Sequence, residues 1–160
     1  MLEIRTEVTI DRSPEEVWAT LMDFERYGEW NPFVREIAGP AVVGERLDAE
    51  LALPGGRAMR FQPRVLVVEP GKEFRWIGVT GSRAIVRGEH VFELHAVSGG
   101  TRLVQWERFG GLLARPFLAL VGKKTRAGFE LMNAALKRRV ETGEGFPVEA
   151  EAGAPAFRVC

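Results

Sequence analysis

The sequence offers few side chains that could do proton-transfer chemistry. It contains two histidines, His90 and His95, one tyrosine, Tyr27, and one cysteine, Cys160, which is the last residue. A histidine can accept or donate a proton near neutral pH, and a neighbouring carboxylate supports that role. Glu107 could be that carboxylate for His90, if both side chains lie on the same face of one sheet. This pair is the starting point for a binding or catalytic site.

Neither a metal site nor a disulfide is predicted. Two histidines on opposite strand faces and a terminal cysteine cannot complete a metal coordination shell, and one cysteine cannot form an intramolecular disulfide. The glycine pairs lack both the ending and the structural context of a phosphate-binding loop. We therefore expect no metal and no other cofactor.

Alternation of apolar and polar residues predicts the strands that would carry the pair. This period is typical of a strand with one buried face. It marks residues 2–10, 34–38, 45–53, 58–69, 72–78, 84–97 and 101–109. Glycine- and proline-rich turns separate the later segments, which indicates an antiparallel sheet of about seven strands.

The turns also predict how neighbouring strands pair, because a slip of one residue would move every side chain to the other face. A two-residue turn at Gly99-Gly100 pairs Phe92 with Glu107 and places His90 diagonally across from Glu107. Gln105 falls on the same face of the last strand. His90, Gln105 and Glu107 are therefore expected to point inward together.

Two further hairpins give matching faces in the same way. A two-residue turn at Pro70-Gly71 pairs Val67 with Phe74. The Pro-Gly-Gly turn upstream pairs Ala49 with Phe61. Since the mainly apolar faces coincide in all the hairpins, the strand assignments agree with one another.

Helices are predicted at both ends of this strand-rich region. Ser13 is the expected N-cap of a short helix, and Glu16 completes its capping box. A second short helical turn is expected around Asp23 to Tyr27, ending at Gly28. From residue 112 to about 141 the apolar residues follow a helical period, with Pro116 either in the first turn or after a short lead-in helix. We expect one ligand-binding domain over residues 1–142 and an irregular tail over residues 143–160.

Length, charge and element order bound the class of protein. A run of strands followed by a helix predicts an α+β domain in which a curved antiparallel sheet wraps around the long C-terminal helix. The 160 residues carry 22 basic and 22 acidic side chains, so no overall charge favours nucleic acid as a partner. No run approaches the roughly 18 apolar residues that would span a bilayer, so we expect no stable membrane insertion and a cytoplasmic location.

The inward aromatic residues allow two interpretations. They could fill the core completely, or they could line a cavity. The polar residues on the same faces favour a cavity, because a buried carboxylate is costly unless it is paired, and a few convergent polar groups in an apolar cleft are typical of ligand sites. A structural His–Glu pair that closes one end of the sheet remains the alternative. The candidate ligand-binding residues are Trp30, Phe61, Trp76, His90, Phe92, Gln105, Glu107, Phe117, Phe129 and Met132.

Several short motifs follow one another along the chain. They are Ser13-Pro14-Glu15-Glu16-Val17-Trp18, Trp30-Asn31-Pro32-Phe33, the segments from Gly88 to Leu94 and from Gly99 to Gly111, and Met132-Asn133-Ala134-Ala135-Leu136-Lys137. In this order they resemble the START-like helix-grip superfamily, often labelled SRPBCC, and within it the polyketide cyclase/dehydrase and lipid-transport group. The resemblance covers roughly residues 2–141 and implies a helix-grip fold that binds a hydrophobic molecule.

Three functions are open at this point. The first is binding or transport of a small hydrophobic ligand, lipid-like, aromatic or polyketide-like, without catalysis. The second is a cyclase or dehydratase in which His90 and Glu107 act as acid and base, although the sequence shows no nucleophile with a base at a recognisable spacing. The third is an assembly factor that uses the basic runs Lys123-Lys124 and Lys137-Arg138-Arg139, which could equally be a solvated helix face. We expect binding rather than catalysis.

Overall fold

The order of helices and strands defines an α+β domain. The structure is a computed structural model that describes residues 2–82 and 84–145. Its elements are β1 (Leu2–Ile10), α1 (Pro14–Leu21), the 3₁₀ helix η1 (Phe24–Arg26), α2 (Tyr27–Trp30), β2 (Val34–Ala38), β3 (Asp48–Ala52), β4 (Ala58–Phe61), β5 (Arg64–Glu69), β6 (Glu73–Thr80), β7 (Val86–Val97), β8 (Gly100–Gly110) and α3 (Ala114–Thr142). Most of the tail expected after residue 142, including Cys160, lies outside the described residues.

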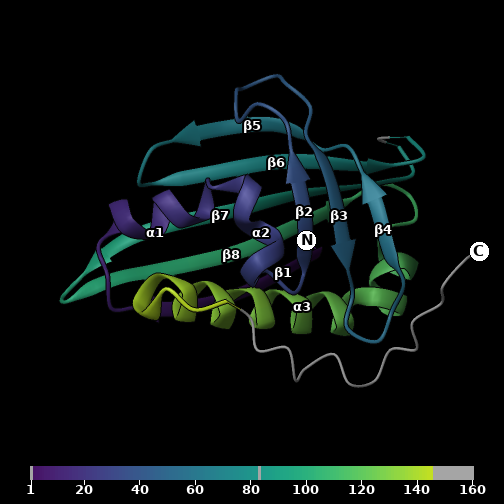
Figure 1. Ribbon diagram of the computed structural model, residues 1–160. Helices are drawn as coiled ribbons and strands as arrows, with labels where there is room; N and C mark the ends of the chain where they lie inside the picture. Colours follow the sequence, from purple (N-terminus) through teal and green to yellow (C-terminus); the bar gives the residue numbers. More distant parts are fainter. Residues whose placement is uncertain (1, 83, 146–160) are drawn as a thin grey trace, which may run out of the picture.

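The strands form two antiparallel sheets that together grip α3. The larger sheet has the order β1-β8-β7-β6-β5 and the smaller one β2-β3-β4. A bridge between Arg46 and Arg64 joins the sheets, and the Leu47 amide donates to the Pro63 carbonyl at 2.9 Å beside it. In Figure 1, α3 runs along one side of the sheets, and α1 lies over β7 and β8. This arrangement confirms the predicted helix-grip fold.

The structure divides one predicted strand into two. Residues 58–69 were expected to be continuous, but β4 ends at Phe61 and β5 begins at Arg64. Pro63 explains the break, since it has no amide hydrogen to donate to a neighbouring strand. The chain changes sheets at this point, and the strands of the described residues number eight rather than about seven.

The hairpin between β7 and β8 has a different register from the predicted one. The turn residues are Ser98 and Gly99, and Gly99 has a φ of 80°. Gly100 is already the first residue of β8, and only glycine fits there because a Cβ at this position would overlap the Ile10 carbonyl of β1. The predicted pairing is therefore wrong by two residues, and His90 lies directly opposite Glu107. Since the shift is even, the inward face is unchanged.

The hairpin between β5 and β6 also corrects a prediction. A β-bulge shifts the register between Val65 and Val67, so that Val68, and not Val67, lies opposite Phe74. The predicted pairing of β3 with β4 is confirmed, because Ala49 lies opposite Phe61.

The predicted helices are present, although α2 extends to Trp30 rather than ending at Gly28 and α3 begins at Ala114 rather than at residue 112. Ser13 caps α1, and the Glu16 side chain accepts from the Ser13 amide at 3.0 Å. Pro116 lies in the first turn of α3, where its missing amide hydrogen breaks no helical hydrogen bond. The helix runs on without interruption to Thr142 and is followed by Gly143 with a φ of 76°.

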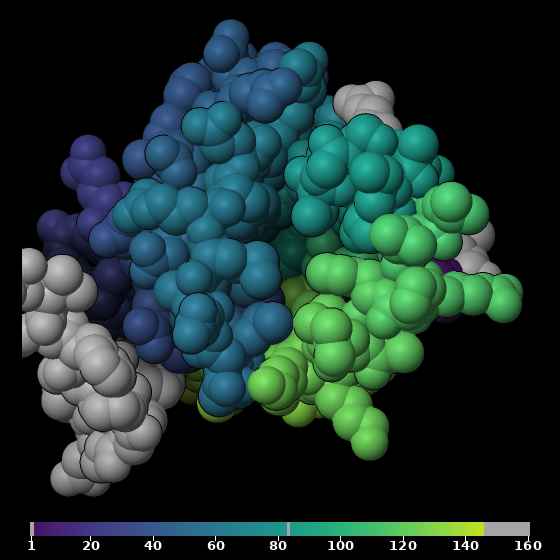
Figure 2. Space-filling view, turned by 90° about the vertical axis from the view of Figure 1, so that its right-hand side faces the viewer, coloured from purple at the N-terminus to yellow at the C-terminus, as the bar shows by residue number. Residues whose placement is uncertain are grey.

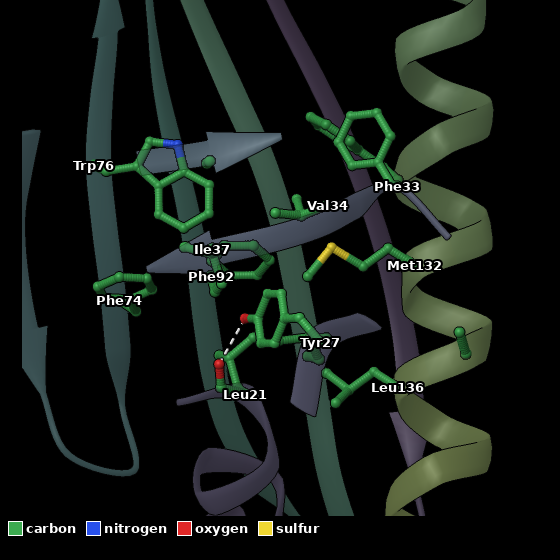
Figure 3. Close-up of a cluster of buried hydrophobic side chains, with 14 of the residues drawn as sticks. Leu21, Tyr27, Phe33, Val34, Ile37, Phe74, Trp76, Phe92, Met132 and Leu136 are labelled. Carbon is green, nitrogen blue, oxygen red and sulfur yellow. Dashed lines mark hydrogen bonds between the residues drawn. The ribbon is translucent and has the colours of Figure 1, made fainter. Parts of the chain in front are cut away.

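Aromatic side chains fill the space beneath the middle and the C-terminal half of α3. Figure 3 shows Tyr27, Phe74 and Phe92 reaching from different elements toward Met132 and Leu136 of the helix. The buried Tyr27 hydroxyl donates to the Leu21 carbonyl at 2.6 Å, and burial raises the pKa of this phenol.

A glycine of α3 makes room for an aromatic side chain from the segment before β2. Phe33, which directly precedes β2, packs edge-on against Phe129 with ring centres 5.5 Å apart. A Cβ at position 128 would overlap the Phe33 ring. Gly128 therefore lets the aromatic side chain lie directly on the helix backbone.

We expect Gly128→Ala to destabilise the protein by about 1–3 kcal/mol, because the added methyl group would force the buried Phe33 ring to move. Gly122→Ala on the same helix is the matched control. A Cβ at position 122 would contact only Leu118, at 3.5 Å, and alanine favours a helix by up to about 1 kcal/mol. The midpoint of urea denaturation should therefore fall in Gly128→Ala and rise in Gly122→Ala. Equal shifts would show that the Phe33 contact imposes no constraint.

The C-terminal end of α3 is tied to the β1–α1 connection. The Glu141 carboxylate accepts from the Asp11 amide at 2.8 Å and from Lys137 Nζ at 2.6 Å. The Arg12 guanidinium donates to the Glu141 carbonyl at 2.9 Å. The hydrogen bond from Asp11, supported by Lys137, lowers the pKa of the Glu141 carboxyl.

This lowered pKa predicts a pH-dependent contribution to stability. A group whose pKa is depressed by folding stabilises the protein above its unfolded pKa, roughly 4.3 for glutamate, and loses this effect as the pH falls through its folded value. Wild type should therefore be more stable than Glu141→Gln at pH 7, and the difference in denaturation midpoint should vanish on acidification. Glu130→Gln, an exposed change on the same helix, should show no such trend. A pH-independent difference would contradict the assignment.

Candidate functional site

An apolar cavity opens between the two sheets beside the N-terminal half of α3. Its volume is about 110 Å³. The residues around it come from the β3–β4 hairpin, from β6, β7 and β8, from α3, and from the segment before β2. They are Phe33, Leu51, Leu53, Met59, Phe61, Trp76, Gly78, Val79, Thr80, Val86, Gly88, His90, Glu107, Phe109, Phe117, Val121 and Thr125. Figure 2 shows the hollow between the β3–β4 region, the β6–β7 connection and the start of α3.

Two charged or titratable side chains border this cavity, and they face each other across β7 and β8. His90 Nδ1 lies 3.7 Å from Glu107 Oε2. The Glu107 side chain is 18% exposed, whereas the His90 side chain is only 3% exposed. Glu107 is therefore the more accessible of the two side chains to a bound molecule, and His90 lies deeper in the cavity wall.

Aromatic rings hold the His90 imidazole in place. The ring centres of Trp76, Phe92 and Phe129 lie 5.0, 4.6 and 4.8 Å from that of His90. A ring packed on three sides has little freedom to rotate, so the direction of its nitrogen atoms is fixed. Nδ1 consequently stays directed toward Glu107.

The buried Gln105 amide contacts the other imidazole nitrogen. Gln105 Nε2 lies 3.0 Å from His90 Nε2 and 3.6 Å from the sulfur of Met132. An amide nitrogen can only donate, so His90 Nε2 accepts and the imidazole proton lies on Nδ1, facing Glu107. Gln105 Oε1 has no hydrogen-bond partner within the described residues.

A glycine makes room for the carboxylate. A Cβ at position 88, two residues before His90 on β7, would overlap Glu107 Oε1. Gly88 thus allows Glu107 to extend across the neighbouring strand to the cavity wall. The sequence analysis missed this residue, although the correct register would have placed Gly88 beside Phe109 on the inward face.

The ten residues expected from the sequence fall into two groups. Phe61, Trp76, His90, Glu107 and Phe117 line the cavity. Trp30, Phe92, Gln105, Phe129 and Met132 are buried in the packed interior and do not border it. Additional lining residues that sequence reasoning missed include Val121 and Thr125, which lie one helical turn apart on α3.

The remaining polar candidates lie away from the cavity. His95 is on the outer face of β7, where its Nε2 is 3.4 Å from Glu93 Oε2. In residues 2–82 and 84–145, no three His, Cys, Asp or Glu side chains come close enough together to hold a metal ion. No helix in the same ranges is both long and apolar enough to cross a membrane.

A sheet wrapped around a long C-terminal helix, with an apolar cavity beside it, defines a helix-grip domain of the kind that binds hydrophobic ligands. The sequence of residues 1–141 matches the family described as polyketide cyclase / dehydrase and lipid transport, and the chain belongs to this family. No curated protein sequence matches it significantly.

Solved structures of several bacterial proteins have the same fold. A Rhodobacter sphaeroides protein is 20% identical, with a TM-score of 0.70 over 89% of this chain and 93% of its own. The AHSA1-like protein of Aeromonas hydrophila is 18% identical, with a TM-score of 0.67 over 98% of this chain and 100% of its own. The Aha1 dimer of Colwellia psychrerythraea is 20% identical, with a TM-score of 0.67 over 91% and 100%. At these identities the comparison establishes the fold alone.

The contacts of His90 with Gln105 and Glu107 predict which nitrogen of its neutral imidazole carries the proton. We expect nitrogen-15 NMR at neutral pH to show the proton of the neutral imidazole on Nδ1, because Nε2 accepts from Gln105. In Gln105→Leu this preference should weaken. The exposed His95 provides the internal contrast, since its Nε2 lies 3.4 Å from the Glu93 carboxylate and its proton should therefore lie on Nε2. A proton on Nε2 in the wild type would mean that Gln105 presents its oxygen, and would contradict the proposed orientation.

Proposed function

We propose that this protein binds a small amphiphilic molecule whose hydrogen-bond donor, a hydroxyl or an amine, contacts Glu107. The observation that carries the proposal is the position of this carboxylate. It lies at the wall of an apolar cavity, with His90 Nδ1 3.7 Å away, and no described residue comes close enough to donate a hydrogen bond to it. A carboxylate in apolar surroundings requires a donor, and a bound ligand would supply one.

The size of the cavity limits the part of the ligand that it encloses. At about 110 Å³ it is smaller than the roughly 300–1,000 Å³ of a typical site for a drug-sized molecule. An apolar cavity of about 150 Å³ holds benzene in another protein. One ring or a short chain therefore fits inside, and the rest of a larger ligand would extend through the mouth.

The wall chemistry favours an aromatic or aliphatic body for this ligand. Phe61, Trp76, Phe109 and Phe117 offer ring faces and edges around the space, and Val121 completes it on α3. Aromatic rings also favour a cationic group held close to their faces. An amine that pairs with Glu107 would thus be favoured over a neutral alcohol of the same shape.

Membership of the family supports the proposal at a coarser level. Its description names both lipid transport and polyketide cyclase or dehydrase activity. Binding of a hydrophobic molecule is common to the two. The ligand and its donor group are inferred here from the geometry around Glu107.

A second candidate is catalysis at the same wall. The observation in its favour is the alignment of His90 Nδ1 with Glu107 Oε2, 3.7 Å apart, which could pass a proton to or from a bound ligand. Glu107 would touch the ligand and His90 would position and tune it. Binding alone requires only the carboxylate, whereas catalysis requires the pair.

A panel of related probes would test the proposal. We expect 4-alkylphenols and 4-alkylanilines or benzylamines to raise the melting temperature and to bind in calorimetry, and benzoates of the same shape to bind more weakly. Glu107→Gln should weaken binding of the amines about 10–100-fold, since a hydrogen bond to a charged group contributes about 1.5–3 kcal/mol. Equal affinity for amines and benzoates, unchanged in Glu107→Gln, would refute the proposed contact.

A second pair of variants tests the cavity itself. Val121→Trp would fill it from α3 and should abolish probe binding while the protein stays folded. Ala119→Trp, an exposed change on the same helix, is the control and should bind normally. Mass spectrometry of the recovered probes separates binding from catalysis. A chemically altered probe that requires both His90 and Glu107 would favour the enzyme.

A further inference from the structure

Exposed aliphatic side chains gather around the mouth of the cavity. Ten large apolar residues are exposed in the described part of the chain, and six of these lie on the segments that surround the opening. We call these six the mouth rim: Met59, Val79, Ile85, Leu112, Leu113 and Leu120. Leu112 and Leu120 project furthest, with exposures of 86% and 80%.

Backbone contacts hold the parts of the mouth rim together. Leu112 donates its amide hydrogen to the Ala84 carbonyl at 2.8 Å, and Leu113 donates to the Ile85 carbonyl at 3.0 Å. The start of α3 is thereby joined to the β6–β7 connection. In Figure 2 these segments, in green and teal, border the hollow opposite the blue β3–β4 region. The apolar side chains thus form one surface around one opening.

The chain segments that carry the mouth rim are rich in basic residues. Residues 51–68, 74–88 and 108–129, about a third of the chain, contain eleven of the 22 Lys and Arg and none of the 22 Asp and Glu. Part of this positive charge is balanced on outer faces, since Arg60 and Arg75 form ion pairs with acidic residues of other segments.

Other cations near the mouth have no such partner. Arg57, Arg115, Lys123 and Lys124 are exposed, and within the described residues none of them forms an ion pair. The protein has a formal net charge of zero. It nevertheless presents a basic, apolar face at the end where its cavity opens.

We propose that the mouth rim docks on the surface of an anionic lipid bilayer. Leu112 and Leu120 would enter the boundary between headgroups and acyl chains, and the surrounding Arg and Lys side chains would contact lipid phosphates. The cavity would then open toward the membrane, and an amphiphilic ligand could move between the two without crossing water. The docking stands independently of the ligand, and only this transfer role rests on the proposed function.

Two features favour a bilayer over a protein partner. The exposed residues of the mouth rim are all aliphatic, whereas the residues that dominate protein interfaces are mainly Trp, Tyr and Arg in packed pockets. They also project from three separate segments around an opening, so a rigid partner would have to fit around a hole. A fluid surface with negative charge accommodates both the separated side chains and the surrounding cations.

Vesicle flotation tests the docking with no ligand added. We expect the wild type to bind vesicles of phosphatidylglycerol and phosphatidylcholine at least tenfold more tightly than vesicles of phosphatidylcholine alone, with weaker binding at high salt. Leu112→Glu/Leu120→Glu should reduce binding at least tenfold, and Lys123→Glu/Lys124→Glu should remove the preference for anionic lipid.

Val97→Glu is the matched control, because Val97 is also exposed, at 39%, but lies at the opposite end of β7. It should bind like the wild type, and circular dichroism should show that all variants are folded. Binding that is equal in the mouth-rim variants and the wild type would overturn the proposal. So would a wild type that binds polyaspartate but neither kind of vesicle, since the surface would then recognise an acidic polymer rather than a bilayer.

Failure of docking is distinguishable from failure of ligand binding. Val121→Trp closes the cavity from inside and should leave flotation unchanged, whereas the Leu112 and Leu120 changes should leave binding of soluble amines unchanged. A protein that binds amines in solution but not vesicles would keep its proposed ligand site and lose its proposed docking surface.

Discussion

Packing of aromatic rings around His90 determines where a ligand can go. Trp76, Phe92 and Phe129 surround the imidazole and fill the interior beneath the middle of α3. Because dense packing fills the interior in this half, the cavity between the sheets lies at the end near the N-terminus of the helix. The same rings fix the imidazole, so its Nδ1 faces Glu107. The location of the cavity and the direction of its polar wall thus have one physical origin.

Much of this architecture could be predicted from the sequence, because it depends on local periodicity and capping. The strand faces, the Ser13 cap and the long α3 follow from patterns within a few residues. The β7–β8 register does not, since Gly99 and Gly100 are chemically identical and the proximity of Gly100 to the Ile10 carbonyl of β1 is visible only in the folded structure. The bulge between Val65 and Val67 likewise has no local signal.

The division between core and cavity lay beyond sequence reasoning for a different reason. Phe92 and Phe61 are both inward aromatic residues on strands, but Phe92 is fully buried while Phe61 lines the opening. Alternation of apolar and polar residues indicates which face of the sheet a side chain is on. It does not indicate whether that part of the face is packed or borders a cavity. Gly88 shows the same limit, because its role depends on a Glu107 side chain that crosses from another strand.

The mouth has unequal sides, and this affects how a molecule can pass through it. The start of α3 and the β6–β7 connection are joined by two backbone hydrogen bonds, from Leu112 and from Leu113. The opposite side is β4, an edge strand that pairs only with β3. Separating the joined side would break main-chain contacts, whereas the β3–β4 hairpin can bend as a unit about its base. We therefore expect the β3–β4 hairpin, rather than the joined side, to move when a molecule enters the cavity.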